Sequence, residues 1–161
     1  MNFVKCNTKI LKFLYVIIGL TFIIWSVTTF LHKPASSQFQ PKLLPQTSLG
    51  VGDYRLAVEM ATTEAERTQG LSGRESLLDG HGMLFFFDTP NLYGFWMKEM
   101  KFAIDIIWIN EDWQVVEVKR GVSPESYPEV FYPRAMAKYV LELKAGQAEH
   151  FGIDIGTKLN F

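Results

Sequence analysis

The sequence predicts a mainly β fold, an antiparallel β-sandwich or open barrel with two short helices, preceded by one transmembrane helix. Three observations predict it. After residue 50, six or seven short apolar or alternating runs are separated by turn signals, without the rhythm of β-α-β units. Two short segments between these runs carry helix patterns. Near the N-terminus, one uncharged apolar run is long enough to cross a bilayer.

The apolar run covers residues 13–31 and, as a helix, would rise about 28 Å, close to the roughly 30 Å of a hydrocarbon core. Lys5, Lys9 and Lys12 precede it, and the positive-inside rule therefore places the N-terminus in the cytoplasm. The expected location is the bacterial inner (plasma) membrane, as a single-pass protein with its C-terminal domain outside the cytoplasm. A cleavable signal peptide is the alternative interpretation.

The segment that follows has the composition of a tether. Residues 33–51 contain three prolines with several serines and glutamines, and they lack a periodic apolar pattern. The predicted organisation is a cytoplasmic N-terminus (1–12), a transmembrane signal anchor (13–31), a flexible linker (32–50) and a single extracytoplasmic β domain (51–161).

Charge is distributed unevenly along the chain. The first 49 residues hold five lysines and no acidic residue, so the rest carries 11 of the 16 basic residues and all 17 acidic ones, a net charge of −6. A domain with this balance repels nucleic-acid phosphates, and we expect no nucleic acid among its partners. Cys6 precedes the apolar run, so the predicted domain contains neither a disulfide nor thiol chemistry.

Within the domain, residues 54–61 alternate as a strand. Thr63 and Glu66 form a capping-box pattern and Gly70 supplies a stop, which predicts a helix over residues 64–69. The two residues Glu111 and Asp112 join two apolar runs and predict a hairpin. The other predicted elements are strands at 83–87, 94–98, 103–110, 113–119, 137–143 and 158–161, a helical turn at 145–151, and a long surface loop at 121–134.

Five ordered blocks between Tyr54 and the C-terminus resemble a known family. The blocks are Thr63-x-x-Glu66-Arg67-x-x-Gly70-Leu71-x-Gly73-Arg74, Gly82-Met83-Leu84-Phe85, Phe95-Trp96-Met97-Lys98, Asp105-Ile106, and Ala137-x-Tyr139-Val140-Leu141-Glu142-Leu143-x-Ala145-Gly146. In this order they resemble the domain of unknown function 192 family. The resemblance implies a compact, mainly β domain, often exported in bacteria, with no established activity. The chain departs from the family pattern at Glu99, Met100 and Ala103, where the family commonly has Asn, Thr and Pro.

Asp105 is the centre of the candidate site, because it lies inside the run 103–109 that otherwise reads as a strand buried on both faces. Strand periodicity places Trp96 and Lys98 beside it, and Arg74 is a further charged residue that could converge there. The predicted ligand-binding residues are therefore Arg74, Trp96, Lys98 and Asp105, with the indole as a platform for a sugar or small acid. In the competing interpretation, Asp105 is a structural anchor that accepts backbone N–H groups or pairs with a basic residue.

The leading hypothesis is a membrane-tethered extracytoplasmic domain, attached through its N-terminal helix, that binds a small polar ligand or an envelope protein without turnover. The alternative is an envelope hydrolase that uses Asp105 with Glu59 as its two carboxylates. The three histidines are scattered without ligand spacing, so neither a metal nor another cofactor is expected.

Overall fold

The structure is a computed structural model that describes residues 44–161. The predicted cytoplasmic N-terminus, the predicted anchor and the first part of the predicted linker lie outside the described residues. Within residues 44–161, no helix has both the length and the apolar character needed to span a bilayer.

Seven strands form one sheet with the order β6-β5-β8-β3-β2-β1-β9. A second sheet pairs β4 with β7. The strands are β1 (Gln46–Val51), β2 (Tyr54–Ala61), β3 (His81–Asn91), β4 (Phe95–Trp96), β5 (Ile104–Ile109), β6 (Val115–Val122), β7 (Val130–Phe131), β8 (Ala137–Lys144) and β9 (Leu159–Asn160); the helices are α2 (Glu64–Gln69), α3 (Gln147–His150) and the 3₁₀ turn η1 (Pro124–Ser126).

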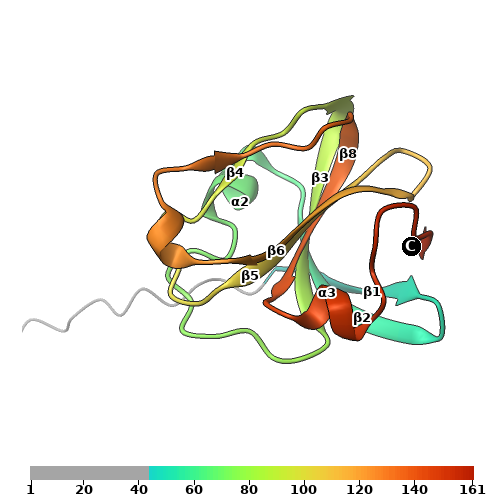
Figure 1. Cartoon of the computed structure of the whole chain (residues 1–161), viewed down its shortest axis with the longest axis horizontal. Helices are drawn as coiled ribbons and strands as arrows, with labels where there is room; N and C mark the ends of the chain where they lie inside the picture. Colours follow the sequence, from blue (N-terminus) through green and yellow to red (C-terminus); the bar gives the residue numbers. More distant parts are fainter. Residues whose placement is uncertain (1–43) are drawn as a thin grey trace, which may run out of the picture. The chain divides into compact units, whose positions relative to one another are not determined.

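The large sheet curls into a half-barrel (Figure 1). Its two outer strands approach each other at one end, where Gln114 and Lys158 form a β-bridge beside β6 and β9. The Leu159 N–H donates to the Trp113 carbonyl at 2.9 Å and so reinforces this contact. The sequence-based prediction of a mainly β fold with two short helices is confirmed. The prediction left a β-sandwich and an open barrel as alternatives; the structure has one large sheet curled into a half-barrel.

One strand pair was not expected. β2 and β3 run parallel, with Glu59 opposite Met83, whereas every other neighbouring pair in the two sheets is antiparallel. The connection between them contains α2 and the turn after it, because parallel neighbours need a crossover. The predicted absence of a β-α-β connection is therefore wrong at this one place.

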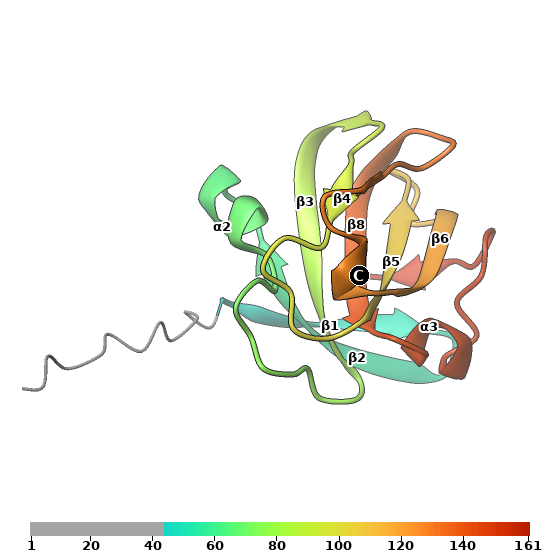
Figure 2. The same cartoon turned by 60° about the vertical axis from the view of Figure 1, so that its left-hand side comes forward.

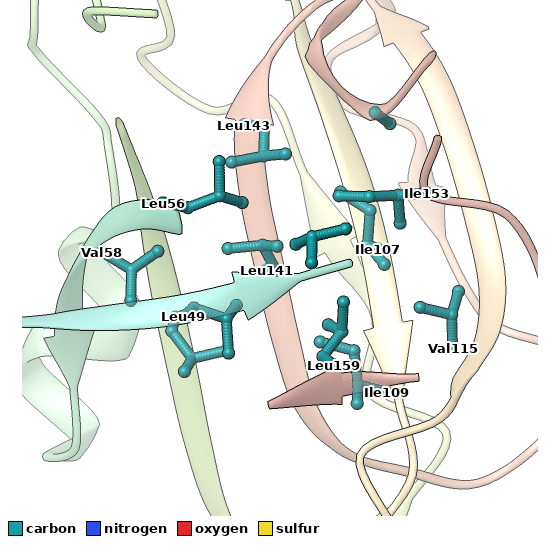
Figure 3. Close-up of a cluster of buried hydrophobic side chains, with 13 residues drawn as sticks. Leu49, Leu56, Val58, Ile107, Ile109, Val115, Leu141, Leu143, Ile153 and Leu159 are labelled. Atoms are coloured by element: carbon teal, nitrogen blue, oxygen red, sulfur yellow. The ribbon is translucent and has the colours of Figure 1, made fainter. Parts of the chain in front are cut away.

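The sheet buries apolar residues on both faces. The first core fills the inside of the half-barrel, and Figure 3 shows Leu49, Val58, Ile107, Leu141 and other side chains converging there. All seven strands of the large sheet contribute to this core. The second core lies on the opposite face and includes Met83, Phe85, Met97, Ile106 and Trp108. α2 and α3 lie on opposite sides of the molecule (Figures 1 and 2). Burial on both faces explains why the central strands are almost wholly apolar.

Three segments differ from their predictions. Residues 46–50, placed in the flexible linker, form strand β1 together with Val51, and Leu49 and Val51 are buried in the first core. The predicted strand at 94–98 is reduced to Phe95–Trp96 and pairs with β7 instead of lying beside β5. The predicted surface loop at 121–134 contains η1 and β7. In each case a tertiary contact that sequence periodicity does not encode decides the local structure.

Candidate functional site

An aromatic cleft of about 280 Å³ opens on the face that carries the second core. It is lined by α2 with the turn after it and by the segment around β4, which are drawn close together in Figure 1. Five aromatic residues contribute to its lining: Phe85, Phe87, Tyr93, Phe95 and Trp96. Its polar lining comes mainly from α2 and the following turn, with Glu64, Arg67, Gln69 and Ser72. An apolar hollow with a few polar groups is the usual form of a small-molecule site.

The aromatic walls are held by contacts among themselves and with the core. Phe85 and Phe95 meet edge to face with ring centroids 5.0 Å apart, and Phe87 stacks on Tyr93 at 3.5 Å. The buried Trp108 donates its indole N–H to the Tyr93 carbonyl at 2.8 Å. This hydrogen bond ties the rim of the cleft to strand β5, so the cleft is part of the folded framework.

α2 begins with the capping box that the sequence predicts. The Thr63 hydroxyl accepts from the Glu66 N–H, and the Glu66 carboxylate accepts from the N–H groups of Thr62 and Thr63. These backbone hydrogen bonds, Thr63 first, lower the pKa of Glu66 to about 2. The helix ends at Gly70, whose N–H donates to the Glu66 carbonyl. The short helix is thereby fixed as one wall of the cleft.

Glu142 is the residue of the cleft that sequence reasoning missed. It lies on β8, is 4% exposed and contributes to the lining of the cleft. Its Oε2 has no hydrogen-bond partner. Burial raises the pKa of this carboxyl group to about 8, against the opposing charge of Arg74. At neutral pH the fold therefore holds Glu142 mainly as a neutral acid.

Arg74 forms an ion pair with Glu59 close to this carboxyl. Its two terminal nitrogens donate to the two oxygens of Glu59 at 2.5 and 2.8 Å, and both side chains are about nine-tenths buried. The Leu44 N–H also donates to Glu59 at 3.0 Å. Burial raises the pKa of Glu59, but the hydrogen bonds from Arg74 and Leu44, with the Arg74 charge, outweigh it and leave the pKa below its ordinary value. Glu59 is thus the ionised partner of Arg74.

Sheet register connects this ion pair with Glu142. Glu59 lies opposite Met83 on β3, and Met83 lies opposite Glu142 on β8. Laterally paired residues point to the same face of a sheet, so both acids lie on the face of the second core. Glu59, Arg74 and Glu142 therefore form one buried charged cluster beneath the cleft.

Asp105 lies on the other face and acts as an internal anchor. It is fully buried, and its two oxygens accept the N–H groups of Gly121 at 2.8 Å and Ala148 at 2.9 Å. These bonds tie β5 to the end of β6 and to α3. Of the two interpretations left open by the sequence, this geometry agrees with the structural one. Asp105 alternates with Ile106, which faces the second core, and so it does not meet Arg74, Trp96 or Lys98 in one site.

The other predicted site residues lie at or near the cleft. Trp96 is 49% exposed and lines both the cleft and a shallower hollow next to it. Lys98 is exposed and lines that second hollow, beside α2. Its carbonyl accepts from the Ser72 hydroxyl at 2.8 Å, which holds the two walls together. The structure therefore brings Trp96 near Lys98, places Arg74 below the cleft, and leaves Asp105 out.

Glu59 and Asp105, the carboxylates of the hydrolase hypothesis, do not share a site. They point to opposite faces of the sheet, and their strands are separated by β3 and β8. Three steps of about 4.8 Å separate the two strands laterally by roughly 14 Å, beyond the carboxyl separations of glycosidases. The pair therefore cannot act on one bond.

Glu142 could have been found by the same sequence signal that singled out Asp105, an acidic residue inside an apolar strand. Glu142 interrupts the run of Val140, Leu141 and Leu143, which are all buried on a central strand. The sequence predicted a strand at residues 137–143 but did not show that β8 is covered on both faces, which is what buries Glu142. Among residues 44–161 there is also no group of three or more His, Cys, Asp or Glu arranged to hold a metal ion.

The DUF192 family model, whose description is "Uncharacterized ACR", matches residues 47–161. The chain belongs to this family. Membership confirms the resemblance of its five sequence blocks, and the match includes most of β1. No curated protein matches the chain.

Two solved structures resemble this member of the DUF192 family. One is a protein from Sinorhizobium meliloti 1021 described as a proposed transcription regulator; it is 30% identical, with a TM-score of 0.66, over 71% of this chain and 91% of that one. The other is a protein of unknown function from Novosphingobium aromaticivorans DSM 12444; it is 28% identical, with a TM-score of 0.68, over 80% and 89% of the two chains. The similarity extends over nearly the whole of both neighbours.

Proposed function

We propose that this DUF192 protein is a membrane-tethered extracytoplasmic domain that binds a small polar ligand in its aromatic cleft, without turnover. The observation that carries the proposal is the cleft itself, whose lining combines five aromatic side chains with the buried Glu142, one of whose carboxyl oxygens, Oε2, has no hydrogen-bond partner. The hydrolase alternative loses its support because its two carboxylates lie on opposite faces. The tether rests on the apolar run 13–31 and the lysines before it.

A role in DNA binding, suggested by the description of the Sinorhizobium neighbour, is not favoured for this chain. Residues 50–161 carry a net charge of −6, and nucleic-acid affinity depends on basic side chains that neutralise phosphates.

The ligand proposal is tested by thermal-shift screening of the full chain against small polar molecules. A compound that binds the folded state stabilises it by RT ln(1 + [L]/Kd), so the melting temperature rises with the logarithm of the compound's concentration once that exceeds Kd. Trp96→Ala should abolish the shift, because Trp96 lines the cleft. Tyr54→Ala is the matched control, since Tyr54 is an aromatic residue of equal exposure that does not line the cleft. Equal loss in both variants would contradict binding at this site.

The tether is tested separately with a topology reporter fused after Phe161. The reporter should be active outside the cytoplasm, and activity confined to the cytoplasm would contradict the proposed location.

An envelope protein is a second candidate partner, favoured by an exposed apolar surface beside the cleft. The residues of this surface lie on or next to the β4–β7 sheet and are Trp96, Tyr127, Val130 and Tyr132. Clustered exposed aromatics mark interaction surfaces more often than isolated ones do. A Tyr132→Ser variant should weaken capture of such a partner while leaving ligand shifts intact.

A further inference from the structure

The carboxyl group of Glu142 lacks a counter-charge within the fold. The basic group whose charge acts on it is Arg74, which is already paired with both oxygens of Glu59. Burial and the Arg74 charge are the two influences on the Glu142 pKa. The single positive charge of Arg74 is neutralised by Glu59, so no further positive charge is left to stabilise an ionised Glu142, which stays protonated. Such a cluster can accept exactly one more positive charge while remaining neutral, if Glu142 gives up its proton as that charge arrives.

The remaining charged groups around the cleft do not provide a counter-charge for Glu142. Glu64 and Arg67 of α2 line the cleft with opposite charges. The Nη1 group of Arg67 donates to the carbonyls of Thr62 and Phe86 at 2.6 and 2.9 Å, and the guanidinium lies near the Phe87 ring. His81 on β3 acts on Glu59, and Asp105 on β5 points to the other face. The neighbourhood of Glu142 is thus close to electrical balance before any ligand enters.

The aromatic walls favour a positive charge over a negative one. Aromatic rings attract cations through their electron-rich faces, and several rings around a cavity form the usual cage for ammonium groups. The wall already stabilises one cation, because the Arg67 guanidinium lies 5.1 Å from the centre of the Phe87 ring. A volume of about 280 Å³ suits a ligand of about one ring or a short chain.

We propose that the cleft binds an organic ammonium ion, which lies against the aromatic rings and pairs with the carboxylate of Glu142. This inference rests on the proposed binding function and names its ligand class. On binding, the O–H bond of Glu142 breaks and its proton passes to solvent, while the ammonium supplies the missing counter-charge. The site thereby exchanges a proton for an organic cation, and its total charge does not change.

A neutral alcohol or an anion would use the site less well. An alcohol can hydrogen-bond to the neutral acid, but it gains nothing from the electron-rich ring faces and supplies no counter-charge. A carboxylate would be repelled by those faces and by Glu59, and the guanidinium that could hold it is already paired.

The test compares three probes that share one ring: benzylammonium, benzyl alcohol and benzoate. Each is titrated calorimetrically into the full chain in nonionic detergent at pH 7, in two buffers with different heats of ionisation. Benzylammonium should bind at least tenfold more tightly than the other two. The difference in heat between buffers should report release of roughly one proton per ligand, because Glu142 is protonated beforehand.

Two variants locate the effect. Glu142→Gln keeps the shape of the neutral acid but cannot ionise, so it should lose the tenfold preference and the proton release while keeping its affinity for benzyl alcohol. Glu149→Gln removes one acid from α3, away from the cleft lining, and should keep both. Proton release in wild-type protein remains informative even if Glu142→Gln fails to fold.

Three results would overturn the inference: equal binding of benzyl alcohol, preference for benzoate, or benzylammonium binding that Glu142→Gln leaves intact. The first two would leave the proposed binding function standing with another ligand class. If none of the probes binds, the ammonium proposal is wrong. The broader proposal of ligand binding is then tested independently by the thermal-shift screen with Trp96→Ala.

Discussion

At the scale of single residues, three of the four buried acids in residues 44–161 differ in their partners, and the fourth, Glu117, pairs with the exposed Arg134 at 3.5 Å. Asp105 receives two backbone N–H groups, Glu59 receives a guanidinium, and Glu142 receives no hydrogen bond at Oε2. A buried carboxylate normally needs such partners, because the interior does not replace its hydration. Asp105 and Glu59 therefore have their polar partners within the fold, whereas Glu142 keeps one oxygen without a partner, which is why the proposed ligand site centres on it.

Asp105→Asn tests the anchor role. An amide has one oxygen in place of two, so it leaves one backbone N–H facing an NH₂ group in a dry interior. We expect the free energy of unfolding to fall by about 2–4 kcal/mol, the usual effect of breaking a buried, charge-assisted hydrogen bond. Urea denaturation followed by circular dichroism measures it. Asp154→Asn is the control, because Asp154 is largely exposed in its pair with Arg120 and should change stability by less than about 1 kcal/mol.

Glu142 should make stability depend on pH in an unusual direction. Its pKa is raised from 4.5 to about 8 on folding, so between these values the folded state binds more protons than the unfolded state. Its contribution is complete below pH 4.5 and is lost as the pH rises through 8, with a slope of at most about 1.4 kcal/mol per pH unit. Glu142→Gln should remove this slope. Urea titrations at pH 5, 6, 7 and 8 measure the slope of the unfolding free energy against pH. An unchanged slope in Glu142→Gln would show that another group causes the pH dependence.

At the scale of elements, close approach of strands fixes the positions of the acids. Gly82 on β3 lies where a Cβ would come within 2.8 Å of the Glu142 carbonyl and 2.7 Å of Leu143. Backbone atoms cannot move aside as a flexible side chain can. The spacing of β3 and β8, and with it the depth of Glu142 beneath the cleft, therefore depends on this glycine.

Gly82→Ala should destabilise the domain by about 1–3 kcal/mol through overpacking. Gly50→Ala is the matched control, since its closest contact is the far end of the Arg55 side chain, which can swing away. Thermal unfolding of both variants measures the difference. Similar melting temperatures for the two would show that β3 and β8 separate without cost.

Elements with a local signal were predicted well from the sequence. The capping box of α2 and the hairpin between β5 and β6 agree with the structure, because each depends on residues close together in the chain. β1 and the short β4 were misjudged, since partners remote in sequence decide them. The same limit applies to the site: the sequence singled out Arg74, Trp96 and the oddity of Asp105, but the face to which each acid points is set by strand register.

At the scale of the whole molecule, the ordered domain begins before the predicted boundary at residue 51. β1 pairs with β2 over six positions and also holds β9, and it contributes Leu49 and Val51 to the core inside the half-barrel. Without it, β2 becomes an exposed edge and β9 loses its partner in the sheet.

A fragment of residues 44–161 should therefore fold cooperatively, whereas a fragment of residues 52–161 should not. Each large apolar side chain removed from the core costs on the order of 2–5 kcal/mol, so the loss of two leaves little of a typical domain's 5–15 kcal/mol. Heteronuclear NMR spectra of the two fragments distinguish a dispersed pattern from a collapsed one. A dispersed spectrum from the shorter fragment would make β1 dispensable.

The hydrogen bond from the Leu44 N–H to Glu59 gives the domain a mechanical property. Tension on the chain before Leu44 would load this bond first and then the β1–β2 ladder, beginning at the pair Gln46 and Glu59. Bonds loaded one after another open at lower force than bonds loaded together. Because the first one to open belongs to the partner of Arg74, tension applied before Leu44, as through the proposed tether, would reach the charged cluster before it reached the cores.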